Sequence, residues 1–278
     1  MGLLNGKIAI VTGCGRGLGE ATAMLLAGEG AAVSISDIIP LEELEKKVGD
    51  KIRASGARVL CSETDTSKEE QVNNMVQRTI TEYGTIDILI NNVGISGPTE
   101  DCWKIPIDEW KRTLAVNVDG TFLCSKAVIP KMIEKRWGRI VNLSSVTGKN
   151  PQAHRTPYAT SKMGLIGFTR SLASEVGRYG ITVNAVCPGT PGTERNVEVG
   201  RDLAKYLGQP FDPDLYRKMY EERRKSGVLA GKYLLGEGFS QALIEQEDVA
   251  SLILFLCSDA ACRITGQDIN VSAGEIMW

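Results

Sequence analysis

Short apolar runs alternate with longer segments of helical spacing along most of the chain. The apolar runs are typical of strands buried on both faces, and they cover Lys7–Thr12, Ala31–Ser36, Ala57–Cys61, Ile86–Ile90, Arg139–Leu143, Ile181–Cys187 and Gly266–Val271. The segments between them predict helices over Glu20–Glu29, Leu41–Ser55, Lys68–Tyr83, Trp110–Lys135, Thr156–Tyr179 and Asp248–Cys257. This alternation predicts the α/β class, with a parallel sheet covered by helices on both faces. Because no biased linker or repeat interrupts it, we expect residues 1–278 to form one doubly wound domain.

One stretch breaks the alternation. Residues 194–246 are charged, rich in tyrosine and punctuated by glycines. We predict one or two helices here, inserted over the edge of the sheet before the last helix and strand, as a lid and a wall of the substrate pocket. The alternative is a surface excursion that packs on itself.

The charge balance argues against two kinds of partner. The chain has 32 Lys and Arg residues and 34 Asp and Glu residues, which gives a net charge of −2. It therefore lacks the positive field that attracts nucleic acid or an anionic membrane surface. No apolar run is long enough to span a bilayer. We expect a small-molecule substrate, with neither nucleic acid nor a membrane as partner.

The cysteine and histidine content argues against disulfide bonds and a metal site. An odd count of seven cysteines, with no Cys-x-x-Cys spacing, favours reduced thiols over a disulfide framework. The chain has one histidine, so a His-rich metal site is not available, and we expect no metal. The first residues lack the pattern of a signal peptide. Together these features favour a cytoplasmic protein.

The first strand leads directly into a glycine-rich loop and then into a helix. The loop reads Thr12-Gly13-Cys14-Gly15-Arg16-Gly17-Leu18-Gly19. Its glycines let the backbone turn tightly and approach a pyrophosphate, which rests at the positive N-terminus of the helix. A plain turn is the alternative, but this order of strand, loop and helix is the context that makes a dinucleotide site credible. We predict a Rossmann-type cofactor site at Gly13, Arg16, Gly17, Leu18 and Gly19.

The residue that ends the second strand bears on the choice of cofactor. Asp37 follows the glycines by about 20 residues, where a carboxylate accepts hydrogen bonds from the adenosine ribose and repels a 2′-phosphate. We therefore predict NAD rather than NADP. Arg16 is the competing signal, because it can reach a phosphate, and an Asp that only starts a turn is the other alternative. After the third strand, Asp65 either contacts the adenine amino group or caps the next helix, with Thr66 beside it.

Ser145, Tyr158 and Lys162 form the candidate catalytic group. Tyr158 and Lys162 are four residues apart, so in a helix they are neighbours on one face. An unperturbed tyrosine has a pKa of about 10, and a nearby cation lowers that pKa by favouring the phenolate. With a hydroxyl from Ser145, such a pair suits proton transfer to or from an alcohol or ketone oxygen. The alternative is an exposed pair on an amphipathic helix.

With these pieces in order, the chain resembles the short-chain dehydrogenase/reductase family over nearly its whole length. The glycine loop resembles the family's cofactor loop. The matching elements beyond it are Asn91-Asn92-Val93-Gly94, with Val in place of the family's Ala, then Asn117, Ser145, Tyr158-x-x-x-Lys162, and Pro188-Gly189 with Thr193. Ser144 matches a position that is not catalytic in the family.

The resemblance implies a role for each matched residue. Tyr158 is the general acid/base, and Lys162 lowers its pKa and binds the nicotinamide ribose. Ser145 hydrogen-bonds the substrate oxygen, and Asn117 positions a water in a proton relay to Lys162. The resemblance also implies cofactor contacts from Asn92, Val93, Gly94, Pro188, Gly189 and Thr193. The implied reaction is NAD-dependent interconversion of a secondary alcohol and a ketone by hydride transfer, in a homotetramer or, next, a dimer.

Departures from the family pattern leave the substrate open. Pro191-Gly192 precedes Thr193, residues 272–275 read Ser-Ala-Gly-Glu, and residues 194–246 are longer than in compact members. One alternative is an NADPH-dependent reductase of 3-oxoacyl thioesters on the same fold. A non-catalytic dinucleotide-binding protein is the other.

Three side chains besides Ser145 are candidates for the substrate. His154 and Arg155 lie between Ser145 and Tyr158, and Arg195 follows Thr193. Either arginine can bind an anionic group such as a carboxylate or a phosphate. The alternative is that these are exposed loop residues.

Overall fold

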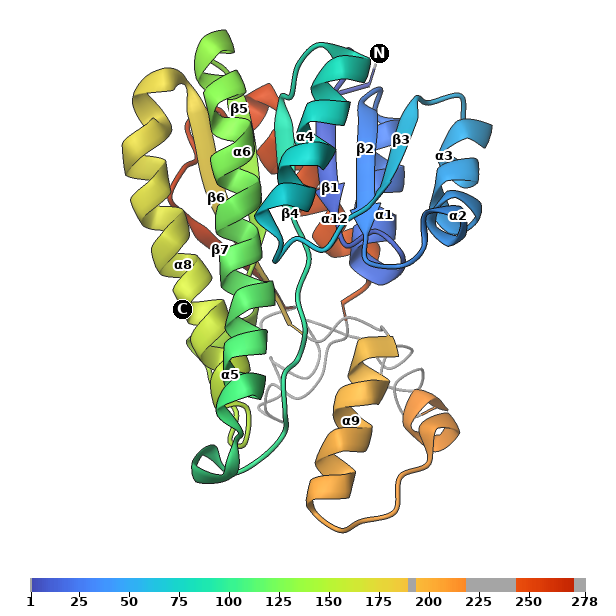
Figure 1. Ribbon diagram of the computed structural model, residues 1–278, viewed down its shortest axis with the longest axis vertical. Helices are drawn as coiled ribbons and strands as arrows, with labels where there is room; N and C mark the ends of the chain where they lie inside the picture. The colour runs from blue at the N-terminus through green and yellow to red at the C-terminus, as the bar shows by residue number, and fades with distance from the viewer. Residues whose placement is uncertain (1, 190–193, 219–243, 273–278) are drawn as a thin grey trace, which may run out of the picture.

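Seven parallel strands form one sheet in the described part of the chain, in the order β3-β2-β1-β4-β5-β6-β7. The computed structural model describes residues 2–189, 194–218 and 244–272 (Figure 1). The strands are β1 (Ile8–Thr12), β2 (Ala32–Asp37), β3 (Val59–Glu63), β4 (Ile88–Asn91), β5 (Gly138–Leu143), β6 (Ile181–Pro188) and β7 (Asp268–Val271). This sheet, with its helices, confirms the predicted α/β class.

The strand order reverses beside β1, which pairs with both β2 and β4. The chain winds outward from β1 through β2 to β3, and then returns to β4 and winds the other way. In open α/β sheets, ligands bind at such a switch point, beyond the carboxyl ends of the strands. The topology therefore fixes where a site is expected.

Helices cover both faces of the sheet (Figure 1). One face carries α1 (Gly17–Gly28), α2 (Leu41–Leu44), the π-turn η1 (Glu45–Gly49), α3 (Asp50–Ala54) and α12 (Gln246–Cys257). The other face carries α4 (Glu69–Tyr83), α6 (Gly120–Lys135) and α8 (Thr156–Val176). The remaining described elements are η2 (Cys102–Lys104), α5 (Ile107–Leu114), the π-turn η3 (Ala115–Asp119), α7 (Val146–Lys149), η4 (Gly177–Tyr179), α9 (Glu194–Tyr206) and η5 (Asp259–Ala261).

Alternate side chains of each strand enter two separate cores. On β1, Ala9 and Val11 pack under α1 and α12, whereas Ile10 packs under α4 and α6. All three are fully buried, and each large apolar side chain removed from water contributes about 1.5–3 kcal/mol. Burial on both faces is why the strands read as continuous apolar runs rather than as alternating ones.

The predicted boundaries differ from the observed ones where pairing or local geometry decides. The third strand was expected over Ala57–Cys61 but covers Val59–Glu63, because it pairs with β2 as far as Asp37 and Glu63. The long helix expected over Trp110–Lys135 begins at Ile107 and contains the π-turn η3. Apolar spacing does not reveal a π-turn, because it adds one residue within an otherwise continuous helix.

Residues 194–246 are described in part. Helix α9 and a short helix over 213–218 lie beyond the carboxyl edge of the sheet, at the bottom of Figure 1. Residues 219–243 lie outside the described part of the chain. They include Tyr220, Tyr233 and Phe239. A helix over the sheet edge was predicted here, whereas a lid function stays a prediction.

Candidate active site

A cavity of about 1000 Å³ lies where β1, β2, β4, β5 and β6 end. It gathers most of the residues that the sequence singled out. Those that line it are Gly13, Arg16, Gly17, Leu18, Gly19, Asp37, Asp65, Thr66, Asn92, Val93, Gly94, Ser145, Tyr158, Lys162, Pro188, Gly189 and Arg195. Asn117, His154 and Arg155 do not line it, and Thr193 lies outside the described residues.

The glycine loop is held in shape by its own close packing. A Cβ on Gly19 would lie 2.0 Å from the carbonyl oxygen of Gly13, so helix α1 approaches the loop only because residue 19 is glycine. The Asn92 amide donates hydrogen bonds to the carbonyls of Thr12 (3.0 Å) and Gly13 (2.9 Å). The Asn92 side chain, predicted as a cofactor contact, thus ties β4 to the loop.

Asp37 lies at the mouth of the loop and orders the backbone around it. One carboxylate oxygen accepts a hydrogen bond from the Gly15 N–H (2.7 Å), and the other accepts from the N–H groups of Ile38 (2.8 Å) and Ile39 (3.3 Å). The carboxylate is thereby fixed at the carboxyl end of β2, beside the loop. This position suits recognition of a ribose hydroxyl.

Arg16 extends away from the loop toward α9. Its guanidinium donates to a carboxylate oxygen of Glu198 at 2.9 Å, and its side chain is 65% exposed. An ion pair this exposed contributes little to stability. It does, however, connect the cofactor loop to the helix that follows β6.

Asp65 does not cap α4, which corrects one of its two predicted roles. The residue before α4 is Lys68, and no side chain caps this helix. The Asp65 carboxylate instead accepts hydrogen bonds from the Ser67 N–H (2.9 Å) and hydroxyl (2.7 Å), in a local turn. Asp and Ser readily form such turns, which explains why the capping pattern misled. The contact with adenine stays a prediction.

Tyr158 and Lys162 lie one turn apart on α8, and both are buried. The Lys162 ammonium donates to the Leu143 carbonyl at the end of β5 (2.7 Å) and lies 5.7 Å from the centre of the Tyr158 ring. The tether from β5 directs the ammonium toward the phenol. The alternative from the sequence was an exposed Tyr158 and Lys162 pair on an amphipathic helix. The burial of both residues excludes it.

Electrostatics prepare the phenol for proton transfer. Burial by itself would raise the pKa of Tyr158, but the charges of Lys162, Arg195 and Arg155 and a hydrogen bond with Ser145 lower it below its ordinary value. Burial lowers the pKa of Lys162, against the opposing effect of Tyr158. A shifted pKa in a residue that lines a cleft is typical of functional sites.

Two consecutive serines after β5 have different surroundings. The Ser144 hydroxyl donates to the backbone carbonyl of Lys162 (2.7 Å), which anchors α8 to the end of β5. The Ser145 oxygen accepts from the Thr147 N–H (3.1 Å) as the cap of α7. Because its oxygen accepts this bond, the Ser145 hydroxyl can donate its proton on the cavity side, where Tyr158 is its neighbour.

Asn117 sits in the π-turn η3, fully buried. Its amide oxygen accepts from the Ile95 N–H (2.7 Å), and its amide nitrogen donates to the Ile95 carbonyl (3.0 Å) and the Ser161 hydroxyl (2.9 Å). The side chain therefore joins α8 to the chain after β4. Single π-turns are frequent at functional sites, and this one lies next to Lys162, since a Cβ on Gly94 would touch both residues.

The three candidate substrate residues have distinct environments. Arg155 is only 9% exposed, with its guanidinium 4.5 Å from the centre of the Tyr158 ring. Arg195 lines the cavity and donates to the Gly94 carbonyl. His154 lies farther out, where its ring stacks on Tyr206 of α9 at 4.3 Å and its Nδ1 lies 3.3 Å from Asp101.

Several cavity residues carry no local signal in the sequence. Arg112 of α5, Glu194 of α9, and Tyr216 and Arg217 of the 213–218 helix also line the cavity. None belongs to a motif, because each is brought there by the path of a helix rather than by its neighbours in sequence. Knowledge of the topology is needed to find them.

The site fits a nicotinamide dinucleotide. A Cβ on Gly17 would meet nothing within 4 Å, so the loop has an open face at the N-terminus of α1. Asp37 and Lys162 line the same cavity as this loop. The loop would hold the pyrophosphate, Asp37 the adenosine ribose, and Lys162 the nicotinamide ribose.

Fold and site together define a Rossmann-type oxidoreductase. The family model of short chain dehydrogenases matches residues 7–204, and the chain belongs to that family. It is 36% identical over 280 residues to the BbsD subunit of a hydroxy(phenyl)methylsuccinyl-CoA dehydrogenase of Thauera aromatica, covering 100% of this chain and 99% of the relative. It is 34% identical over 279 residues to the 3-oxoacyl-acyl-carrier-protein reductase FabG of Aquifex aeolicus, covering 98% of each.

Solved structures of the family agree with this architecture. An NAD+-bound xylitol dehydrogenase superposes with a TM-score of 0.81 at 31% identity, covering 96% of this chain and 98% of that one. A variant of actinorhodin polyketide ketoreductase with NADPH superposes with a TM-score of 0.84 at 28% identity, covering 97% of each. These two structures contain different nicotinamide cofactors, so similarity alone does not choose between NAD and NADP for this chain.

The described residues contain no group of three or more His, Cys, Asp or Glu side chains arranged to hold a metal ion. In the same part of the chain, no helix has the length and apolar character needed to cross a membrane.

Proposed function

We propose that this protein is an NAD-dependent oxidoreductase that interconverts a secondary alcohol and a ketone, with Tyr158 as general acid/base. One observation carries the proposal: a buried phenol with a lowered pKa faces a dinucleotide-sized cavity beside the Lys162 ammonium. A pKa closer to the operating pH makes a group a better general acid or base.

Each polar group of the site has a defined task in alcohol oxidation. The Tyr158 phenolate accepts the alcohol proton, and the charge of Lys162 stabilises that phenolate. The Ser145 hydroxyl donates to the substrate oxygen and holds it against the phenol. Asn117 positions a water that links Lys162 to solvent. When bound, the nicotinamide supplies the hydride acceptor, or the hydride donor in ketone reduction.

Replacement of Tyr158 by Phe tests this assignment. Loss of general acid/base catalysis lowers kcat by about 10²–10⁴-fold, measured by nicotinamide absorbance with a panel of secondary alcohols and ketones. Binding of NADH, followed by fluorescence, is expected to persist. Tyr179→Phe is the matched control, because Tyr179 packs on the core far from the cavity lining. Full activity in Tyr158→Phe would show that another group transfers the proton.

The preference for NAD rests on Asp37. Its fixed carboxylate would repel a 2′-phosphate, while Arg16 is engaged by Glu198. Asp37→Asn keeps an oxygen acceptor for the loop but removes the charge. We expect this change to move the ratio of NADPH to NADH affinity toward NADPH by about 10-fold. Tighter binding of NADPH by the wild type, retained in Arg16→Gln, would contradict the role of Asp37.

An NADPH-dependent reductase of 3-oxoacyl thioesters is the second candidate. The observation in its favour is the similarity to FabG over 98% of the chain. The same cofactor titration separates the two candidates, together with turnover of a 3-oxoacyl thioester. Turnover of any substrate also excludes the third possibility, a non-catalytic dinucleotide-binding protein.

We also propose a homotetramer, with a dimer as the next choice, located in the cytoplasm. The assembly is supported by exposed apolar side chains on α5, α6 and α8, namely Ile107, Phe122 and Met163. We further propose that residues 1–278 form a single domain and that residues 194–246 act as its lid.

A further inference from the structure

Three positive charges surround Tyr158. Lys162, Arg195 and Arg155 each act on the pKa of its phenol and lower it. Lys162 has its task in the proposed reaction, as the group that stabilises the phenolate. The two arginines are not among the four predicted catalytic residues, which are an Asn, a Ser, a Tyr and a Lys. The proposed proton transfer does not require the arginines.

Carboxylates of α9 leave the two arginines unpaired. Glu198 pairs with Arg16 at 2.9 Å, and Glu194 pairs with Arg217 at 3.0 Å. Asp202 of α9 acts on the pKa of Arg155. Among the described residues, none of these three carboxylates forms an ion pair with Arg155 or Arg195.

The Arg155 guanidinium is buried without a carboxylate. Among the described residues it has no ion pair and no side-chain hydrogen bond, and its contact is with the Tyr158 ring. Burial lowers the pKa of this arginine, which reflects the cost of holding a charge away from water. The guanidinium nitrogens are not fully buried, so they are open to solvent or to an anion that enters from outside the chain.

Arg195 is the member of the pair that faces the cavity. It begins α9 one residue after Glu194, and it donates one hydrogen bond to the Gly94 carbonyl. A guanidinium has five N–H donors in a fork that matches carboxylate and phosphate oxygens. Most of these donors remain for a ligand.

We propose that Arg195, with Arg155 as a second positive charge, binds an anionic group of the substrate, a carboxylate or a phosphate, next to the carbinol oxygen at Tyr158. This inference rests on the proposed function and narrows its substrate class to alcohols and ketones that carry an oxyanion. A cofactor pyrophosphate fits these arginines less well, since the glycine loop at the N-terminus of α1 is the place for it.

Matched pairs of substrates test the proposal in the full-length protein with NAD. The pairs are 2-hydroxybutanoate and 3-hydroxybutanoate, each against its methyl ester, and glycerol 3-phosphate against glycerol. We expect the wild type to prefer at least one anion by about 10- to 100-fold in kcat/KM, the range of a charged hydrogen bond. Arg195→Gln should abolish the preference through KM, and Arg195→Lys should retain part of it. Which pair responds distinguishes a carboxylate from a phosphate.

Arg201→Gln is the matched control, because Arg201 lies on the same helix, is exposed, and does not line the cavity. It should leave the preference intact. The proposal is overturned if the wild type uses esters as well as acids, or if Arg195→Gln lowers kcat/KM equally for both. It is also overturned if the variant changes only NADH affinity, which would assign Arg195 to the cofactor.

A second measurement separates this inference from the proposed reaction. Malonate and inorganic phosphate should raise the Tm of the NADH complex of the wild type but not of Arg195→Gln, relative to chloride at equal ionic strength. If no compound is turned over but this difference appears, the reaction is wrong and the anion site stands. If neutral alcohols are turned over and no difference appears, the reaction stands and the anion site is wrong.

Discussion

At the scale of single residues, Gly94 shows how closely the catalytic groups are packed. A Cβ there would lie 3.2 Å from the Lys162 ammonium and 3.3 Å from the Asn117 amide oxygen. Gly94→Ala must therefore displace one of them by a few tenths of an ångström. We expect kcat to fall by about 10-fold, because small misplacements of catalytic groups are costly. Steady-state kinetics measure this effect.

Gly28→Ala at the end of α1 is the control for this substitution. A Cβ at Gly28 meets nothing within 4 Å, and alanine favours a helix over glycine by up to about 1 kcal/mol. Activity should be unchanged and the Tm equal or higher. If Gly94→Ala retains wild-type kcat, the space around Lys162 is not as restricted as the structure indicates.

The charge of Arg155 should contribute to the pH dependence of alcohol oxidation, after those of Lys162 and Arg195. The reaction needs the phenolate, so its rate rises with pH through the pKa of Tyr158, which lies below its ordinary value. Arg155→Met removes a cation and therefore raises that pKa. The rising limb of kcat should move to higher pH with an uncharged alcohol, while the plateau stays similar. Arg201→Met should leave the limb in place, and an unshifted limb in Arg155→Met would contradict the coupling.

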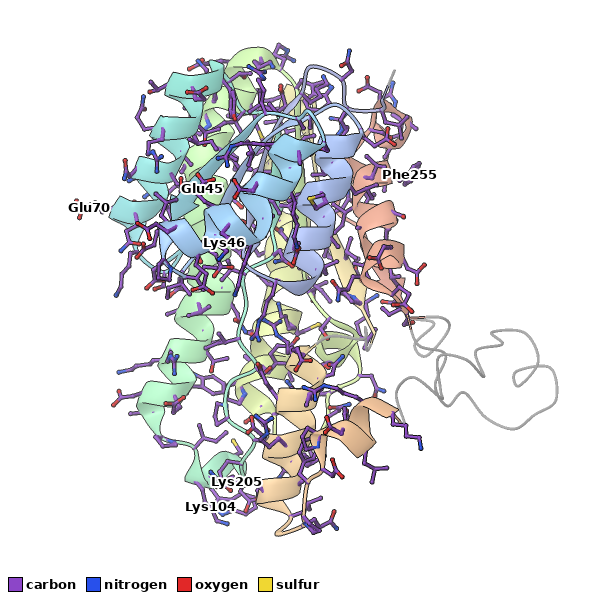
Figure 2. All side chains as sticks on the ribbon, turned by 90° about the vertical axis from the view of Figure 1, so that its right-hand side faces the viewer. Glu45, Lys46, Glu70, Lys104, Lys205 and Phe255 are labelled. Atoms are coloured by element: carbon purple, nitrogen blue, oxygen red, sulfur yellow. The ribbon has the colours of Figure 1, made fainter. Side chains whose placement is uncertain are left out.

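At the scale of elements, α9 is connected to the rest of the molecule at both ends. Glu198 near its start pairs with Arg16 of the glycine loop. Tyr206 at its end donates to Asp101 at 2.8 Å and stacks on His154. Figure 2 shows the labelled Lys205 and Lys104 at the same end of the molecule, in agreement with this contact. The helix thus contacts the glycine loop near its start and the residues Asp101 and His154 at its end.

Removal of one connection should loosen α9 locally. Tyr206→Phe keeps the ring on His154 but loses the hydrogen bond to Asp101. We expect amide hydrogen exchange in Glu194–Tyr206 to rise by roughly threefold, because local opening depends on such contacts. Exchange in α8 should not change, and Tyr179→Phe should alter neither helix. Unchanged exchange in α9 would show that other contacts hold it.

At the scale of the whole molecule, one exposed surface is unusually apolar. Phe122 on α6 is 47% exposed and Met163 on α8 is 53% exposed. The two helices meet there, since Phe122 packs edge to face on Phe168 of α8 at 6.5 Å. Exposed apolar patches of this kind are typical of protein–protein contacts.

This surface should carry part of the proposed tetramer interface. We expect light scattering after gel filtration to give about four times the 30.1 kDa chain mass for the wild type. The double change Phe122→Glu and Met163→Glu should give a smaller species, because it buries charge in the contact. Leu3→Glu, at another exposed apolar residue, should leave the mass unchanged. A tetramer that persists in the double variant would place the interface elsewhere.

The sequence by itself determined the class of fold and many of the residues that line the cavity. Strands buried on both faces read as apolar runs, and a parallel sheet gathers its carboxyl ends at one edge. Gly13, Asp37 and Ser145 could therefore be placed together from their positions after three strands. The contact between Tyr158 and Lys162 could also be predicted from the sequence, because the two residues lie one helical turn apart.

Tertiary structure alone decided what surrounds those residues. The burial of Arg155, the pairing of Arg16 with Glu198 and the place of Arg195 depend on where α9 lies after β6. Contacts of this kind join residues far apart in the chain, and no periodicity encodes them. For the same reason the local turn of Asp65 resembled a helix cap in sequence. The sequence predicted a lowered pKa of Tyr158 from Lys162 alone. The structure adds burial, which raises that pKa, and the charges of Arg195 and Arg155, which lower it.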